Sequence, residues 1–223
     1  MFGFKKIGVA TAAAAVLLPL MSVLGPNAAH AATISFERIT SNSSIDASSQ
    51  LSVVASDEGT EALFSFSVLS GAQSGASISE IYFSDTLGLF TPLPLIRTEQ
   101  GVSFVAGSAS PPNLPGGNNA TPPFQVTDFL LADATGRNSN AIQIGDLLVL
   151  GLVYSQGSDF ADLQNALQRG EFRIGLHVRA LEGGESDSFV STAAPIPLPA
   201  AGWLLLTAVG GLGFAARRRR KAS

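Results

Sequence analysis

Short apolar runs separated by Gly-, Pro-, Ser- and Asn-rich stretches most restrict what this 223-residue chain can fold into. The clearest run extends from Phe172 to Ala180, where apolar residues alternate with Arg173, His177 and Arg179. This period of two is that of a strand with one face in the core and one face at solvent. The most apolar run, Asp146 to Tyr154, predicts a central strand that is covered on both faces.

The remaining runs predict a sheet protein with little helix. We expect further strands at Thr33–Arg38, Leu51–Ala55, Ala62–Leu69, Ala76–Phe83, Leu93–Thr98, Val102–Ala106, Phe124–Leu131 and Ser188–Thr192. A single short helix is expected from Asp159 to Gln168, capped by Ser158 and ended by Gly170. Many short strands with one helix predict an all-β fold, either an antiparallel β-sandwich or a jelly-roll.

The stretch from Gly107 to Pro123 interrupts this pattern. Its residues are mostly Gly, Ser, Asn and Pro, which favour turns. We therefore expect a long exposed loop there, and loops of this length are often functional or disordered.

The N-terminus has the three parts of a secretory signal peptide. Lys5 and Lys6 precede the apolar segment Ile7 to Leu24, and Ala29 and Ala31 are the small residues that signal peptidase accepts. This order predicts a signal peptide over residues 1–31, with cleavage after Ala31 and export of the chain from Ala32 onward.

The C-terminus carries a second apolar segment, Ala200 to Ala216, which contains no charged residue. As a helix it would rise about 26 Å, near the lower limit for crossing a bilayer core of about 30 Å. We therefore expect a transmembrane helix over 200–216. Basic residues next to a span stay on the cytoplasmic side, and this segment is followed by Arg217, Arg218, Arg219, Arg220 and Lys221.

A Pro-rich motif stands directly before this span: Ile196, Pro197, Leu198, Pro199 and Ala200. Together with the span and the Arg run, it resembles the VPLPA-type variant of the PEP-CTERM sorting signals of Gram-negative bacteria. Ile196 departs from the usual Val by one methylene. A plain C-terminal membrane anchor, with prolines that only break the chain before the helix, remains the alternative.

The resemblance implies a sorting domain over residues 195–223. In that family a membrane-embedded Cys protease, exosortase, is thought to recognise the motif and cut the tail, and many members accompany exopolysaccharide and biofilm genes. It therefore implies an exosortase-type protease as a partner. It also implies transient anchoring in the cytoplasmic membrane, followed by residence in the cell envelope, on the surface or outside the cell.

The charge of the exported region, residues 32–194, excludes one class of partner. This region contains all 17 acidic residues of the chain but only six basic residues, none of them Lys, so its formal net charge is −11. Phosphate binding needs clustered cations, and we therefore expect no nucleic-acid partner. The absence of Cys excludes disulfides, and one histidine, His177, excludes a site with several His ligands.

The sequence contains no pattern that is typical of a catalytic site. His177 is the one candidate base for a Ser triad, yet it lies within the predicted strand Phe172–Ala180, where we expect a half-exposed histidine between two arginines. Gly71 to Gly75 places its Ser one position away from that of a nucleophile elbow. We therefore expect no catalytic or cofactor-binding residue and no enzyme.

The carboxylates of two acidic turns are the candidate metal ligands, and calcium is the metal that prefers carboxylate oxygens. Neither turn has the spacing of a known calcium loop, so solvated acidic turns that keep the protein soluble are the alternative. The two groups are Asp57, Glu58 and Glu61, and Glu182, Glu185 and Asp187.

The leading hypothesis is an exported structural or adhesive protein of the envelope or matrix, with exopolysaccharide or other matrix components as partners. Two alternatives remain open: a secreted hydrolase that acts on glycans, and a calcium- or carbohydrate-binding module. Three or more carboxylates converging in a deep pocket would favour the hydrolase.

Overall fold

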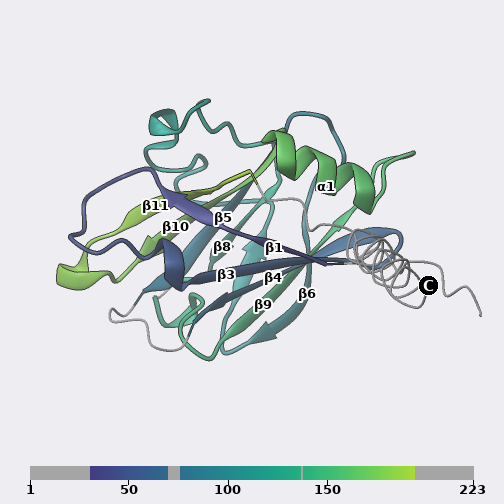
Figure 1. Ribbon diagram of the computed structural model, residues 1–223. Helices are drawn as coiled ribbons and strands as arrows, with labels where there is room; N and C mark the ends of the chain where they lie inside the picture. The colour runs from purple at the N-terminus through teal and green to yellow at the C-terminus, as the bar shows by residue number, and fades with distance from the viewer. Residues whose placement is uncertain (1–30, 70–75, 137, 194–223) are drawn as a thin grey trace, which may run out of the picture.

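The computed structural model describes residues 31–69, 76–136 and 138–193. They form a β-sandwich of two antiparallel sheets, and Figure 1 shows the sheets as two layers, one behind the other. Sheet A has the strand order β1-β3-β4-β9-β6, and sheet B has the order β2-β11-β10-β5-β8-β7. The predicted all-β class and antiparallel sandwich are therefore confirmed for the described residues.

The strands of sheet A are β1 (Ala31–Ile34), β3 (Leu51–Asp57), β4 (Glu61–Val68), β9 (Leu147–Val153) and β6 (Leu95–Gln100). Those of sheet B are β2 (Phe36–Arg38), β11 (Asp187–Ser191), β10 (Phe172–Arg179), β5 (Ser77–Asp85), β8 (Leu131–Ala134) and β7 (Phe104–Ala106). Short 3-10 turns lie at Ser48–Gln50, Gly117–Asn119, Asn138–Asn140 and Glu182–Gly184.

The core between the sheets is built around phenylalanines. Phe64 of β4 lies 5.6 Å from Phe83 of β5 and 5.8 Å from Phe172 of β10, measured between ring centroids. Phe90 completes the cluster, 5.2 Å from Phe172. Aromatic pairs of this kind contribute about 0.5–1.5 kcal/mol each beyond the burial of their area. Because Phe64 belongs to sheet A, and Phe83 and Phe172 to sheet B, the cluster holds the two sheets together.

One α-helix, α1 (Phe160–Arg169), occurs in the described residues, and it connects β9 of sheet A to β10 of sheet B. Its buried residues Phe160, Leu163, Ala166 and Leu167 share one face and pack into the main core. The helix was predicted correctly, but its N-cap is Asp159 and not Ser158. The Asp159 carboxylate accepts a hydrogen bond from the backbone N–H of Asp162, and the Asp162 carboxylate accepts one from the backbone N–H of Asp159, which closes a reciprocal capping box.

Strand β5 is buried along its whole length, with bulky residues on both of its faces. Strict alternation fails within it, because His177 pairs with Glu80 whereas the next residue, Val178, pairs with Ile78. Ser79 is thus the extra residue of a β-bulge, and Ile78 and Ile81 both enter the main core.

Two predicted strands were wrong. The run Thr33–Arg38 is divided at Ser35 into β1 and β2, which belong to different sheets, so Ile34 and Phe36 both reach the core between them. The run Phe124–Leu131 is not a strand before Leu131, because Phe129 has a φ of +63° and turns the chain. The strand that follows this turn, β8, begins at Leu131.

Most of the predicted signal peptide and the whole C-terminal sorting segment lie outside the described residues. Ala31, the last residue of the predicted signal peptide, begins β1 and pairs with Ser56. None of the helices that the structure describes is long and apolar enough to cross a membrane.

Candidate functional site

The residues of the predicted sorting machinery are nearly all beyond the described ranges. Ala29, the motif Ile196 to Ala200 and the basic cluster Arg217 to Lys221 lie outside them, and of this set the structure describes Ala31 alone, at the start of β1. The side chains of the sandwich itself are therefore the ones that can be examined for a site.

The first acidic group, at the β3–β4 turn, does not converge on one point. The Asp57 carboxylate accepts a hydrogen bond from the backbone N–H of Gly59, within its own turn. Glu61 instead pairs with Arg97 of β6 at 2.7 Å. This ion pair crosses β9 at Gly151, where an added Cβ would lie 2.3 Å from Glu61 Oε2. Glu61 thus faces away from the turn that was to hold a metal.

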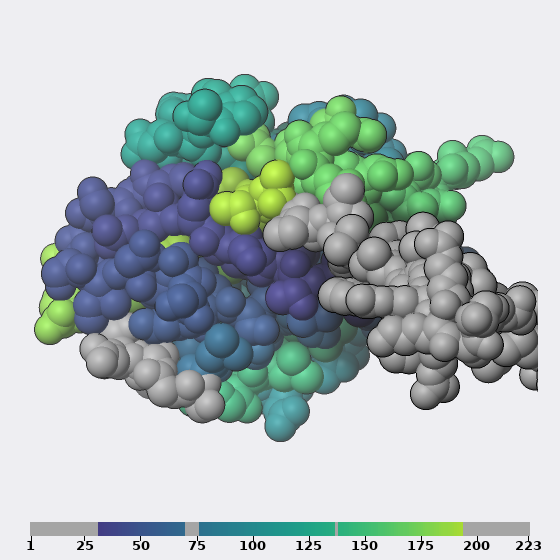
Figure 2. All heavy atoms as spheres, viewed as in Figure 1, coloured from purple at the N-terminus to yellow at the C-terminus, as the bar shows by residue number. Residues whose placement is uncertain are grey.

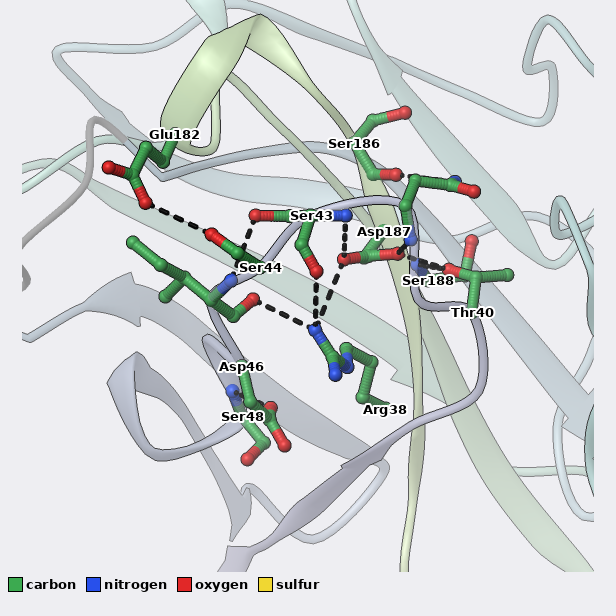
Figure 3. Close-up of polar contacts among 12 residues, drawn as sticks. Arg38, Thr40, Ser43, Ser44, Asp46, Ser48, Glu182, Ser186, Asp187 and Ser188 are labelled. Atoms are coloured by element: carbon green, nitrogen blue, oxygen red, sulfur yellow. Dashed lines mark hydrogen bonds and ion pairs between the residues drawn. The ribbon is translucent and has the colours of Figure 1, made fainter.

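The second acidic group contains Asp187, which is 1% exposed. One of its oxygens accepts hydrogen bonds from Thr40 Oγ1 and from the backbone N–H of Asn42, both at 2.8 Å. The other accepts one from the backbone N–H of Ser43 at 3.1 Å, and the Arg38 guanidinium lies 3.6 Å from it. Figure 3 shows these groups gathered around the carboxylate. Asp187 therefore anchors the 39–46 segment to β11.

Glu182, from the same group, lies on the other side of this segment and accepts a hydrogen bond from Ser44 Oγ at 3.1 Å (Figure 3). Glu185 is exposed. Within the ranges that the structure describes, no three His, Cys, Asp or Glu side chains are close enough together to hold a metal ion. A calcium ion at Asp187 would have to displace the donors that the protein already supplies.

His177 is buried and not half-exposed, so that expectation was wrong. It is 8% exposed, and its Nδ1 lies 2.6 Å from Oε2 of Glu80 on the neighbouring strand β5. The other Glu80 oxygen accepts a hydrogen bond from Arg179, whose side chain is 45% exposed. The alternation of polar residues in β10 is real, but their face of sheet B is covered at Arg173 and His177 and is open to solvent at Arg179.

Asp133 of β8 continues this polar row, because it pairs with Glu80 in the sheet register. Burial raises the pKa of the Asp133 carboxyl, and a hydrogen bond from the backbone N–H of Ser110 opposes that rise. Burial likewise raises the pKa of the Tyr82 hydroxyl, with the Glu80 charge adding to it. These shifts result from the layer of chain that lies over this face.

The covering layer is the 107–130 segment, which we call the strap. Its part from Gly107 to Pro123 was predicted to be a long exposed loop. It is a loop and most of its residues are exposed, but Leu114, Gly117 and Ala120 are buried. Tyr82 Oη donates to the Pro111 carbonyl at 2.8 Å, and the two terminal nitrogens of Arg173 donate to the carbonyls of Pro122 and Pro123 at 2.7 Å. The teal atoms at the top of Figure 2 belong to the strap.

A second, smaller core lies beneath the strap and contains Tyr82, Leu114, Ala120, Phe124, Leu131 and Val190. Gly175 of β10 allows the closest approach, because a Cβ there would lie 2.8 Å from Leu114 Cδ2 and 2.9 Å from Phe124 Cζ. Arg173 lies over the Phe124 ring at 5.4 Å, and burial lowers the pKa of its guanidinium. The strap is therefore a packed third layer on sheet B.

Two adjoining grooves border the strap. The first has a volume of about 400 Å³ and lies between Gly107–Asn113 and Val126–Leu131. The second, of about 470 Å³, shares Asn113 and Val126 with the first and continues to Asn118 and Gln125. Among the described residues that line these two grooves, Asp128 is the one carboxylate. They do not hold the cluster of carboxylates that a glycan hydrolase was expected to show.

Sequence reasoning missed the strap, its grooves and the buried role of Arg173 and His177. The available signal was the presence of Leu114 and Phe124 in an otherwise polar stretch, since two large apolar residues need a surface to bury them. Gly175, within a strand whose other outward residues are large, was a second signal.

Comparison with known proteins adds no relative: no family model, no curated protein and no solved structure matches this chain.

Proposed function

We propose that this chain is an exported structural or adhesive protein of the cell envelope or extracellular matrix. Its C-terminal tail is a sorting signal that an exosortase-type protease removes. The observation that carries this proposal is the order of three segments at the C-terminus: the motif Ile196–Ala200, an uncharged span and a basic cluster. A signal peptide at the other end gives the same direction of export.

The limits of the sandwich support this division of the chain. Its strands extend to Ser191 from Ala31, the last residue of the proposed signal peptide, so all but one strand residue lie between the two proposed signals. The exported region also has a formal net charge of −11 and no Lys, which favours solubility outside the cell.

A role without catalysis is supported by how the buried ionisable groups are used. Glu80 and His177 bind each other within sheet B, and Asp187 accepts hydrogen bonds from the 39–46 segment. Each of these groups thus binds one segment of the fold to another, and none of them lines the two grooves beside the strap.

Substitution of the motif tests the proposal in the native host. The double variant Pro197→Ala/Pro199→Ala should keep its tail and remain in the cytoplasmic membrane, whereas the wild type should be cut and reach the envelope or the medium. Pro92→Ala, at an exposed position of the sandwich, is the matched control and should behave like the wild type. Normal cutting and release of the double variant would contradict the sorting proposal.

A further inference from the structure

The turn Thr127–Leu130 presents an aromatic side chain at the edge of the first groove. Phe129 is 62% exposed, and its φ of +63° lies in the left-handed region, where Gly or Asn is usual at this position of a turn. A bulky residue in this conformation costs on the order of 1–3 kcal/mol. The backbone conformation that exposes the Phe129 ring to water is therefore unfavourable in free energy.

This turn is fixed to the sandwich on both sides. The backbone N–H of Thr127 donates to the Phe83 carbonyl, and the backbone N–H of Phe83 donates to the Leu130 carbonyl, both at 2.9 Å. The Thr127 hydroxyl accepts a hydrogen bond from the backbone N–H of Asp85 at 2.8 Å. Asp128 and Phe129 are thus held on a rigid support, which lowers the entropy cost of binding a ligand.

The groove beside Phe129 has a size within the usual range of ligand sites, about 300–1,000 Å³. Its polar side chains are those of Ser108, Asn113 and Asp128, and the adjoining groove adds Asn118 and Gln125. Amides both donate and accept hydrogen bonds, and a carboxylate accepts them from hydroxyls. The surface therefore suits a ligand that is rich in hydroxyl groups.

The charge of this surface restricts the ligand further. Neither groove is lined by Lys or Arg in the part of the chain that the structure describes. Arg173, close by at Phe124, has both terminal nitrogens bound to the strap's carbonyls. The carboxylate of Asp128 would repel an anionic ligand, and no cation in the grooves would offset that repulsion. An uncharged ligand would not be repelled.

We propose that the two adjoining grooves bind a neutral oligosaccharide, with one sugar ring stacked on Phe129 and its hydroxyls bound by Asp128 and Asn113. The electron-rich face of the phenyl ring attracts the C–H groups on one face of a pyranose. The second groove receives the next sugars of the chain at Asn118 and Gln125. This inference rests on the matrix role proposed above and names the chemical class of its partner.

Binding of the full-length chain, in detergent, to immobilised neutral glucan, mannan and galactan oligomers tests this proposal, with oligomers of uronic acids as the anionic comparison. Phe129→Gly should weaken binding to a neutral oligomer by at least about tenfold. Its melting temperature should not fall, because Gly accepts a φ of +63°. Phe129→Tyr should retain the affinity.

Leu87→Ala is the matched control, since Leu87 is exposed and does not line either groove. It should bind as the wild type does. No binding to any neutral oligomer, binding to the uronic acids alone, or unchanged binding by Phe129→Gly would each overturn the proposal. A chain that is sorted and cut but binds no neutral glycan overturns this inference alone. Glycan binding by a chain whose tail is never cut overturns the sorting proposal alone.

Discussion

The carboxylate of Glu80 lies 2.6 Å from Nδ1 of His177 on the face of sheet B that is turned away from the main core. Both residues are buried there, and Arg179 binds the second oxygen of the same carboxylate. The position of this group beside the strap's core makes it a structural element of the sandwich.

Removal of Glu80 should therefore destabilise the fold. Glu80→Ala leaves the buried His177 ring without its partner, whereas Arg179, whose side chain is 45% exposed, can turn to water. We therefore expect a loss of about 1–3 kcal/mol in the free energy of unfolding. Glu61→Ala removes a carboxylate that is 16% exposed, against 1% for Glu80, and that pairs with the half-exposed Arg97, so it should cost about 0–1 kcal/mol. Urea denaturation of the two variants measures the difference, and equal losses would contradict a structural role for Glu80.

The anchor at Asp187 predicts a local effect. Asp187→Ala leaves the backbone N–H groups of Asn42 and Ser43 without their acceptor, so the 39–46 segment should detach from β11. Hydrogen exchange should quicken first at these two amides, well before exchange in sheet A, and stability should fall by about 3 kcal/mol or more.

The response to calcium tests whether Asp187 is a structural anchor or a metal ligand. Both oxygens of Asp187 are already bound by protein donors, so calcium should not raise the melting temperature through this residue. A stabilisation by calcium that disappears in Asp187→Ala would show that the loop is a metal site after all.

Asp133 predicts a dependence of stability on pH. Burial raises the pKa of its carboxyl in the folded chain, with Glu80 adding to the rise and Arg179 opposing it. The folded state therefore holds the proton more tightly, and stability from this group is present below the unfolded pKa and is lost as pH rises through the folded one.

Asp133→Asn removes this titration and can still accept the hydrogen bond from the Ser110 N–H. The variant should be more stable than the wild type at neutral pH, and the two should converge at acidic pH. Thermal melts across this range provide the measurement. A variant that is less stable at neutral pH than the wild type would contradict the burial argument.

Gly175 predicts how closely the strap packs on sheet B. An alanine there would place its Cβ within 3 Å of Leu114 and of Phe124, which should cost about 1–3 kcal/mol and make the strap more sensitive to proteases. Leu114→Ala removes one of these contacts, so it should cost less in the Gly175→Ala background than in the wild type. Additive losses in the double-mutant cycle would contradict direct contact between the strap and β10.

Elements could be predicted from the sequence where a pattern of neighbouring residues determines them. The hairpin of β3 and β4, the continuous apolar strand β9 and the helix before Gly170 arise from such local patterns. The strap could not be predicted in the same way, because its contacts with Tyr82, Gly175 and Arg173 join segments that are far apart in sequence. Polar residues in β10 indicated a solvent face, but a third layer covers that face as far as His177 and leaves Arg179 exposed.

The groove beside Phe129 was beyond sequence reasoning for a similar reason. Asp128 and Phe129 were interpreted as part of an extended run, and the positive φ that exposes the Phe129 ring is set by the hydrogen bonds that join Thr127 and Leu130 to β5. The proposed terminal signals, by contrast, are patterns of contiguous residues, and their interpretation depends on no tertiary contact.

The mass of the protein recovered from the envelope or the medium tests the central proposal most directly. Samples from native cells with and without the exosortase-type protease should be compared by intact mass spectrometry. We predict a chain that starts at Ala32 and lacks Arg217 to Ser223 when the protease is present, and a chain that keeps this tail in the cytoplasmic membrane when it is absent. Recovery of the same intact tail in both samples would contradict the account.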